Sequence, residues 1–134
     1  MSKVVNWGRW PVAAFVGLEG FAFLGGGAIS IIHGVIRARH GEPVSFYSEY
    51  VDLLWSKPLL LCARGVLKWR PWAHHLALFV AIVNLGIAVP VFFLFPRGGF
   101  GVEMALMTLV AASMATWLLL PTVRSEYRQR ERVA

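Results

Sequence analysis

Long apolar runs, each interrupted by few charged residues, dominate the pattern of hydrophobic and polar positions along this chain. The first run, residues 11–32, contains 22 residues and a single charged side chain, Glu19. A helix of about 20 apolar residues is long enough to cross the hydrocarbon core of a bilayer. Because the apolar region of a secretory signal peptide is shorter, this run is predicted to be a transmembrane helix.

Three further apolar stretches follow, so we expect an all-α membrane protein with a bundle of four transmembrane helices. The predicted spans cover residues 10–33, 47–67, 73–95 and 102–120, and a basic tail covers residues 121–134. A transmembrane β-barrel would need many alternating segments of about ten residues, which the sequence lacks. The whole chain, residues 1–134, is therefore predicted to form a single transmembrane domain.

The second stretch is the most polar of the four, because Asp52, Lys57 and Arg64 interrupt it. Each of its six leucines contributes about −0.5 kcal/mol to insertion, whereas one central lysine costs about 2.5 to 3.5 kcal/mol. Lys57 alone therefore cancels the gain from the leucines, and the segment needs other helices to pack against. The alternative is an interfacial helix over residues 46–56, followed by a short re-entrant piece that begins at Pro58.

Composition and charge agree with a membrane protein. Hydrophobic residues make up 57% of the chain and the mean hydropathy is +0.62, which leaves too little polar surface for a water-soluble globule. The formal net charge of +6 comes from basic residues that lie beside apolar segments, so we interpret them as topology signals and as contacts to anionic lipid rather than to nucleic acid. Their distribution predicts a bacterial inner-membrane protein with both termini and the 68–72 loop in the cytoplasm, although Arg37 and Arg39 lie on the opposite side.

Four polar side chains are predicted to share a layer near the membrane midplane: Glu19, Lys57, Arg64 and Asn84. A lone carboxylate at this depth is costly and normally faces a partner, a cavity or a transport path. Lys57 reaches a similar depth on the neighbouring antiparallel helix, and Arg64 shares its face. We therefore expect Glu19 to form a structural ion pair with Lys57, and the alternatives are a small-molecule or proton site and a contact with other subunits.

Small residues in the first span are predicted to let another helix approach closely; they are Gly17, Gly20, Gly25, Gly26 and Gly27. The alternative for this helix is that it lines a polar pathway, because Glu19, Gly26, Ser30 and His33 fall on one helical face.

The sequence predicts neither a metal site nor a cofactor. A single cysteine, Cys62, excludes an internal disulfide and a thiolate metal cluster. His33 and His40 lie on the outer side, and the adjacent His74 and His75 lie on the inner side and face different directions, so a haem held by two histidines is disfavoured. His33 is the best single candidate for a cofactor ligand because it lies on the Glu19 face at the end of a span. No metalloprotease, hydrolase or phosphate-binding motif is present, so an enzyme is the least favoured class.

Short motifs in the second half of the chain resemble those of small four-span bacterial membrane proteins that have no assigned function. The motifs are Gly65, Trp72–Ala73 before an apolar helix, and the closing stretch from Leu118 to Arg124. The resemblance implies a four-helix architecture and no particular activity.

The expected function is association with other proteins. The chain is too small to offer a large soluble site, so we expect an accessory or scaffolding subunit of a membrane complex, or a homo-oligomer. The expected partners are the lipid bilayer and other membrane subunits or further copies of the chain. The alternative is a small transporter or proton-coupled carrier that uses the Glu19 and Lys57 layer.

Overall fold

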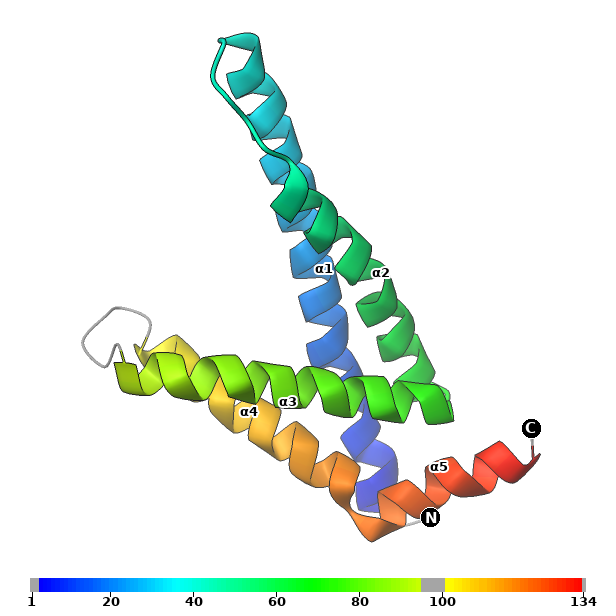
Figure 1. Ribbon diagram of the computed structural model, residues 1–134. Helices are drawn as coiled ribbons and strands as arrows, with labels where there is room; N and C mark the ends of the chain where they lie inside the picture. The colour runs from blue at the N-terminus through cyan, green and yellow to red at the C-terminus, as the bar shows by residue number, and fades with distance from the viewer. Residues whose placement is uncertain (1–2, 95–100, 134) are drawn as a thin grey trace.

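The computed structural model describes residues 3–94 and 101–133, which form five α-helices and no strand (Figure 1). The helices are α1 (Lys3–Arg39), α2 (Tyr47–Leu67), α3 (Pro71–Leu94), α4 (Gly101–Leu119) and α5 (Pro121–Val133). The all-α prediction is confirmed. The basic tail, which was not predicted to span the membrane, forms the helix α5.

Proline and positive backbone dihedrals mark the breaks between helices. Pro71 and Pro121 begin α3 and α5, where a missing backbone N–H is tolerated and the fixed φ suits the first turn. Gly41 has φ +79° in the turn after α1, where glycine avoids the steric penalty of the left-handed region. After α2, Trp69 adopts φ +55°, and the Arg70 N–H donates to the Gly65 carbonyl at 2.9 Å, so the chain reverses within three residues.

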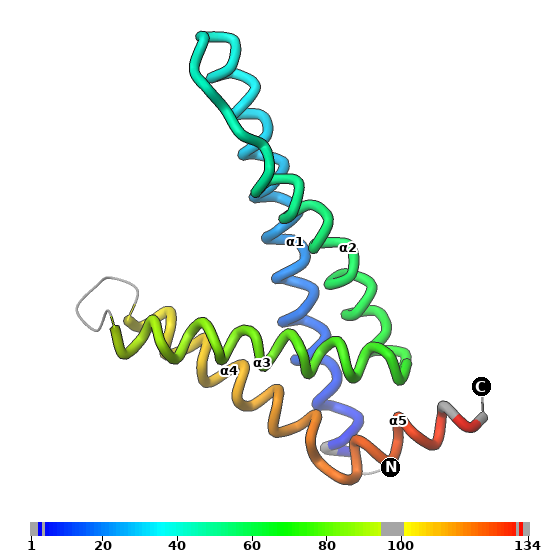
Figure 2. Tube along the Cα trace, in the orientation of Figure 1, coloured from blue at the N-terminus to red at the C-terminus, as the bar shows by residue number. Residues whose placement is uncertain are grey.

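Two helical hairpins make up most of the fold. Helix α1 packs against α2 along the length of α2, and α3 packs against α4 (Figure 2). The two hairpins cross, and beyond the crossing α1 and α2 extend in a different direction from α3 and α4, so the helices do not form one parallel bundle (Figures 1 and 2). The predicted four-helix bundle is corrected in this respect.

The hairpins diverge because their shared core lies at one end only. Cys62 and Val66 near the end of α2 pack with Ala73 and Ala77 near the start of α3, and all four are fully buried. Leu118 at the end of α4 completes this core. Leu53 and Leu60 of α2 pack onto glycines of α1, and in the first half of α2 the Trp55 ring lies 6.4 Å from the Phe79 ring of α3, centroid to centroid.

Three of the described helices, α1, α3 and α4, are long and apolar enough to cross a membrane; four were predicted. Helix α2 falls short because Glu49, Asp52, Lys57 and Arg64 lower its hydropathy. The alternative of an interfacial helix with a re-entrant piece does not match the fold either, because α2 continues through Pro58 without a break.

Candidate functional site

Glycines of α1 set the close approach of α2. A Cβ atom added at Gly20 would lie 2.9 Å from Leu60 Cγ and 3.1 Å from the Leu60 backbone nitrogen. One added at Gly27 would lie 3.1 Å from Leu53 Cγ and 3.2 Å from the Glu49 carbonyl oxygen. Gly17 faces Ala63 at ordinary contact distance. These three predicted packing glycines lie in the α1–α2 interface.

Gly25 and Gly26 do not take part in this packing. A Cβ atom at either position would meet nothing within 4 Å. Instead, Gly34 lies against Phe46 and Val44, and our sequence reasoning missed it. The signal was present, because Gly20, Gly27 and Gly34 recur every seven residues and such a repeat keeps one helical seam facing a partner.

Glu19 finds its partner on α3. It is half-buried, and the side-chain amide of Asn84 hydrogen-bonds to its carboxyl group. The Asn84 amide nitrogen also lies 3.0 Å from the Val80 carbonyl of its own helix. Asn84 is only 6% exposed, so this contact is a polar link between α1 and α3 within an apolar surround.

Lys57 and Arg64 stand apart from that link. Both side chains are exposed on α2, and neither forms an ion pair with Glu19. Within residues 3–94 and 101–133, the salt bridge present is the one between Arg37 and Glu42, at 2.6 Å. The expected Glu19–Lys57 pair is therefore absent, because the register places Leu60 opposite Gly20 and Glu19 turns toward α3.

His33 is exposed near the end of α1. Among the residues that the structure describes, no group of three or more histidine, cysteine or acidic side chains is arranged to hold a metal ion. Hydroxyl groups of α4 form hydrogen bonds within their own helix: the Thr108 hydroxyl donates to the Met104 carbonyl and the Ser113 hydroxyl donates to the Leu109 carbonyl, both at 2.7 Å.

A second buried cluster joins α1, α5 and the α2–α3 turn; its members are Val5, Trp69, Val123 and Tyr127. The Trp69 ring lies 5.0 Å from the Tyr127 ring and 6.2 Å from the Trp117 ring, centroid to centroid. We call this group the Trp69 cluster. It fastens the N-terminal part of α1 and the tail helix to the point where the two hairpins meet.

Two arginines border the Trp69 ring. The guanidinium carbons of Arg9 and Arg130 lie 5.8 and 5.9 Å from it, within the range of a cation–π contact. Arg9 Nη1 also donates to the Leu67 carbonyl at 2.9 Å, which satisfies one of the free carbonyls at the end of α2. Arg9 therefore ties α1 to the end of α2.

Four buried polar atoms of this region have no hydrogen-bond partner among the described residues: Arg9 Nε, Trp69 Nε1, Trp117 Nε1 and the Tyr127 hydroxyl. Burial also raises the pKa of Tyr127. Each unpartnered buried donor costs about 1–3 kcal/mol, so the cluster is held by ring packing. The sequence analysis did not identify this cluster, although Val123 and Tyr127, four residues apart in a polar tail, indicate a buried face.

No protein-family model, curated protein or solved structure significantly matches this chain. The resemblance to small four-span bacterial membrane proteins therefore stays a prediction, and the function has to be argued from the geometry.

Proposed function

We propose that this protein acts by association in a bacterial inner membrane, as an accessory or scaffolding subunit or as a homo-oligomer. In this proposal α1, α3 and α4 cross the membrane, and α2 crosses beside α1 although its hydropathy is too low for it to do so alone. Both termini face the cytoplasm, where the basic residues at the start of α1 and in α5 are stabilised by anionic lipid.

The observation that carries the proposal is the exposed side chain of Lys57, which has no ion-pair partner among the described residues. The contacts of Gly20 with Leu60 and of Gly27 with Leu53 bracket Lys57, so it lies beside the apolar middle of α1. Surrounded by lipid, a lysine at this depth costs about 2.5 to 3.5 kcal/mol on the insertion scale. A carboxylate or a polar groove on a neighbouring subunit would remove that cost.

Two further features favour a partner on the α1–α2 hairpin. Arg64 lies seven residues after Lys57, two helical turns along the same side of α2, and it is also exposed, with no ion-pair partner within residues 3–94 and 101–133. Gly25 and Gly26 leave open space on α1 away from α3 and α4. Small exposed residues on a membrane helix suit close contact with another helix.

The carrier alternative has weaker support. A carrier built on the predicted layer would need Lys57 and Arg64 to line a path together with Glu19. Glu19 is instead engaged with Asn84, and the two cations lie on the exposed side of α2. The predicted polar layer is thus divided: Glu19 and Asn84 contact each other inside the fold, whereas Lys57 and Arg64 lie on the exposed side of α2.

The test is native mass spectrometry of the chain extracted from its own membrane in mild detergent. We expect an assembly heavier than the 14.9 kDa monomer, and we expect Lys57→Met to weaken it because the group that faces Lys57 loses its partner. Lys3→Met, at the exposed start of α1, is the matched control and should leave the assembly intact. A monomeric wild-type chain, or an assembly that tolerates Lys57→Met as well as Lys3→Met, would overturn the proposal.

A further inference from the structure

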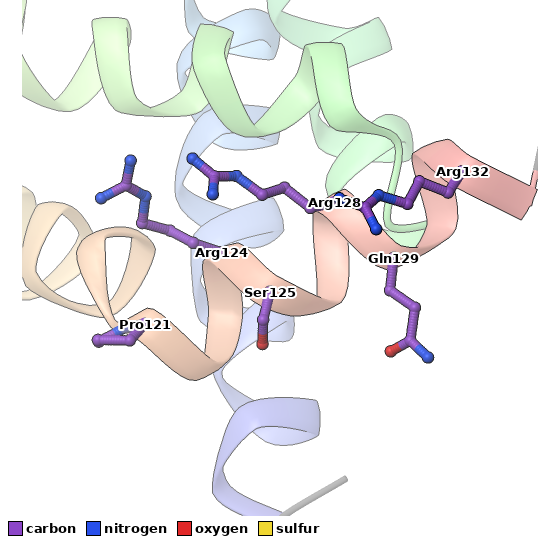
Figure 3. A pocket seen from close by; sticks show the side chains of 6 residues that line it. All are labelled: Pro121, Arg124, Ser125, Arg128, Gln129 and Arg132. Atoms are coloured by element: carbon purple, nitrogen blue, oxygen red, sulfur yellow. The ribbon is translucent and has the colours of Figure 1, made fainter.

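Three arginines line one side of the tail helix α5. Arg124, Arg128 and Arg132 are four residues apart, and Figure 3 shows their side chains projecting from the same side of the helix, whereas Ser125 and Gln129 project from the other. Like charges at this spacing destabilise a helix by a few tenths of a kcal/mol per pair. No carboxylate of the described part of the chain lies within ion-pair distance of any of the three. Among the side chains that the structure describes, the stripe is therefore a concentration of positive charge with no ion-pair partner.

These arginines border two cavities. One, of about 440 Å³, runs along α5 and is lined by all three (Figure 3). The other, of about 160 Å³, lies where α5 faces the first turn of α3 and the end of α4. Arg124 and Arg128 line both cavities, so a ligand in either one would meet two guanidinium groups.

Helix α3 contributes two histidines and its first turn to the smaller cavity. His74 and His75 line it, and both rings are fixed: His74 Nε2 lies 2.8 Å from the Leu118 carbonyl and His75 Nδ1 lies 3.0 Å from the Pro71 carbonyl. Because carbonyl oxygens only accept, each of these nitrogens donates its proton to a carbonyl, so the two rings shape the cavity and the arginines supply its positive charge. The cavity also faces the first turn of α3, the positive end of that helix dipole.

The position of the cavity indicates which anion it suits. Its remaining walls include Leu78, about two turns into α3, and Leu119, the last residue of α4. A lining that combines apolar side chains with two arginines matches a molecule that is charged at one end and apolar at the other. Both α3 and α4 are apolar enough to span a membrane, so the cavity lies where two spans end and lipid phosphates begin.

We propose that this cavity binds a phosphate group, with Arg124 and Arg128 as its charged contacts. Guanidinium groups bind phosphate oxygens through paired N–H donors, which explains why two arginines converge on one small cavity. An anionic phospholipid headgroup and a soluble phosphate share this chemistry. The inference does not depend on whether the protein associates with a partner.

The experiment uses the full chain in a neutral detergent, with phosphatidylglycerol, phosphatidylcholine and inorganic phosphate titrated separately and bound molecules counted by native mass spectrometry. We expect saturable binding of phosphatidylglycerol in preference to phosphatidylcholine. Each of Arg124→Gln and Arg128→Gln should weaken it about tenfold, since a hydrogen bond to a charged group contributes roughly one such factor or more. The double lysine variant at the same positions keeps the charge and should bind better than the double glutamine variant.

The matched control is Arg39→Gln with Lys68→Gln, which removes the same charge from two exposed positions away from the cavity. Inorganic phosphate that binds with the same dependence on Arg124 and Arg128, without a preference for phosphatidylglycerol, would assign the site to a soluble phosphate. Equal losses in the control would mean general surface attraction and would overturn the proposal. Binding unchanged in the double glutamine variant, or no binding of any of the three probes, would overturn it as well.

Discussion

The glycine seam between α1 and α2 gives a sharp test, because two glycines six residues apart on one helix have opposite surroundings. Gly20 lies under Leu60, whereas Gly26 faces open space. Replacing either with alanine adds one methyl group and gives the same gain in helix propensity, about 0.5–1 kcal/mol. The difference between the two variants therefore isolates the packing of α1 against α2.

The magnitude follows from the distances. At Gly20 the added Cβ would lie 2.9 Å from Leu60 Cγ and 3.1 Å from the Leu60 backbone nitrogen. The leucine side chain can rotate away, but the backbone nitrogen moves only with α2, so overpacking of about 1–3 kcal/mol is expected. Gly26→Ala should then stabilise the protein by about 0.5–1 kcal/mol, and Gly20→Ala should be about 1–3 kcal/mol less stable than Gly26→Ala.

The assay is unfolding of the purified chain in mixed micelles by increasing sodium dodecyl sulfate, followed by tryptophan fluorescence. Gly20→Leu extends the series, since a larger side chain should separate the helices further, and Phe92→Leu on an exposed side of α3 is its control. If Gly20→Ala is as stable as Gly26→Ala, or Gly20→Leu is tolerated as well as Phe92→Leu, the close approach of α2 to α1 is refuted.

Three further predictions use the same protein. Asn84→Leu should destabilise the protein by about 1–3 kcal/mol in the unfolding assay because Glu19 loses its partner. Glu19→Gln should cost less than about 1 kcal/mol because the glutamine side chain can still accept a hydrogen bond from Asn84. A larger loss for Glu19→Gln would indicate that Glu19 forms a buried ion pair. Tyr127→Phe should be neutral or stabilising and Tyr127→Ala should cost about 3–5 kcal/mol, since the hydroxyl lacks a partner and the ring is packed. Because burial raises the pKa of Tyr127, the wild type should lose stability as the pH rises above its ordinary value of about 10, and a loss of equal size in Tyr127→Phe would contradict this assignment. Cysteines placed at Lys68 and Ser45 should react with impermeant reagents from opposite sides of the membrane; labelling from one side would remove α2 as a span.

The sequence predicted helices better than it predicted their arrangement. The apolar runs placed α2 at residues 47–67 and the starts and ends of α3 and α4 within two residues, because hydropathy changes sharply where those helices end. Helix α1 extends well beyond residues 10–33, because the flanking residues 3–9 and 34–39 contain no proline and their two glycines lie inside the helix. Hydropathy alone does not detect helical segments that are polar. Pro11 lies inside it without ending it.

The site was harder to predict, because its contacts depend on the register and crossing of helices. Depth along the chain put Lys57 near Glu19, but it could not show that Glu19 turns toward Asn84 on a different hairpin. Trp69 is buried only because it adopts a left-handed conformation and α5 returns to cover it, and both are tertiary features. The glycines that contact α2 could have been identified from the sequence, because Gly20, Gly27 and Gly34 recur every seven residues, whereas the number of glycines in the segment does not distinguish them from Gly25 and Gly26.

The Trp69 cluster has a consequence for the order in which the protein is made. Trp69 becomes available once α2 and the following turn have left the ribosome, but its covering residues, Val123 and Tyr127, are synthesised more than 50 residues later. During that interval the first hairpin can pair through its glycines, while the ring that joins it to the rest of the protein stays uncovered. Completion of the fold therefore waits for the last described helix, and chains halted before Tyr127 should present Trp69 to quality-control proteases.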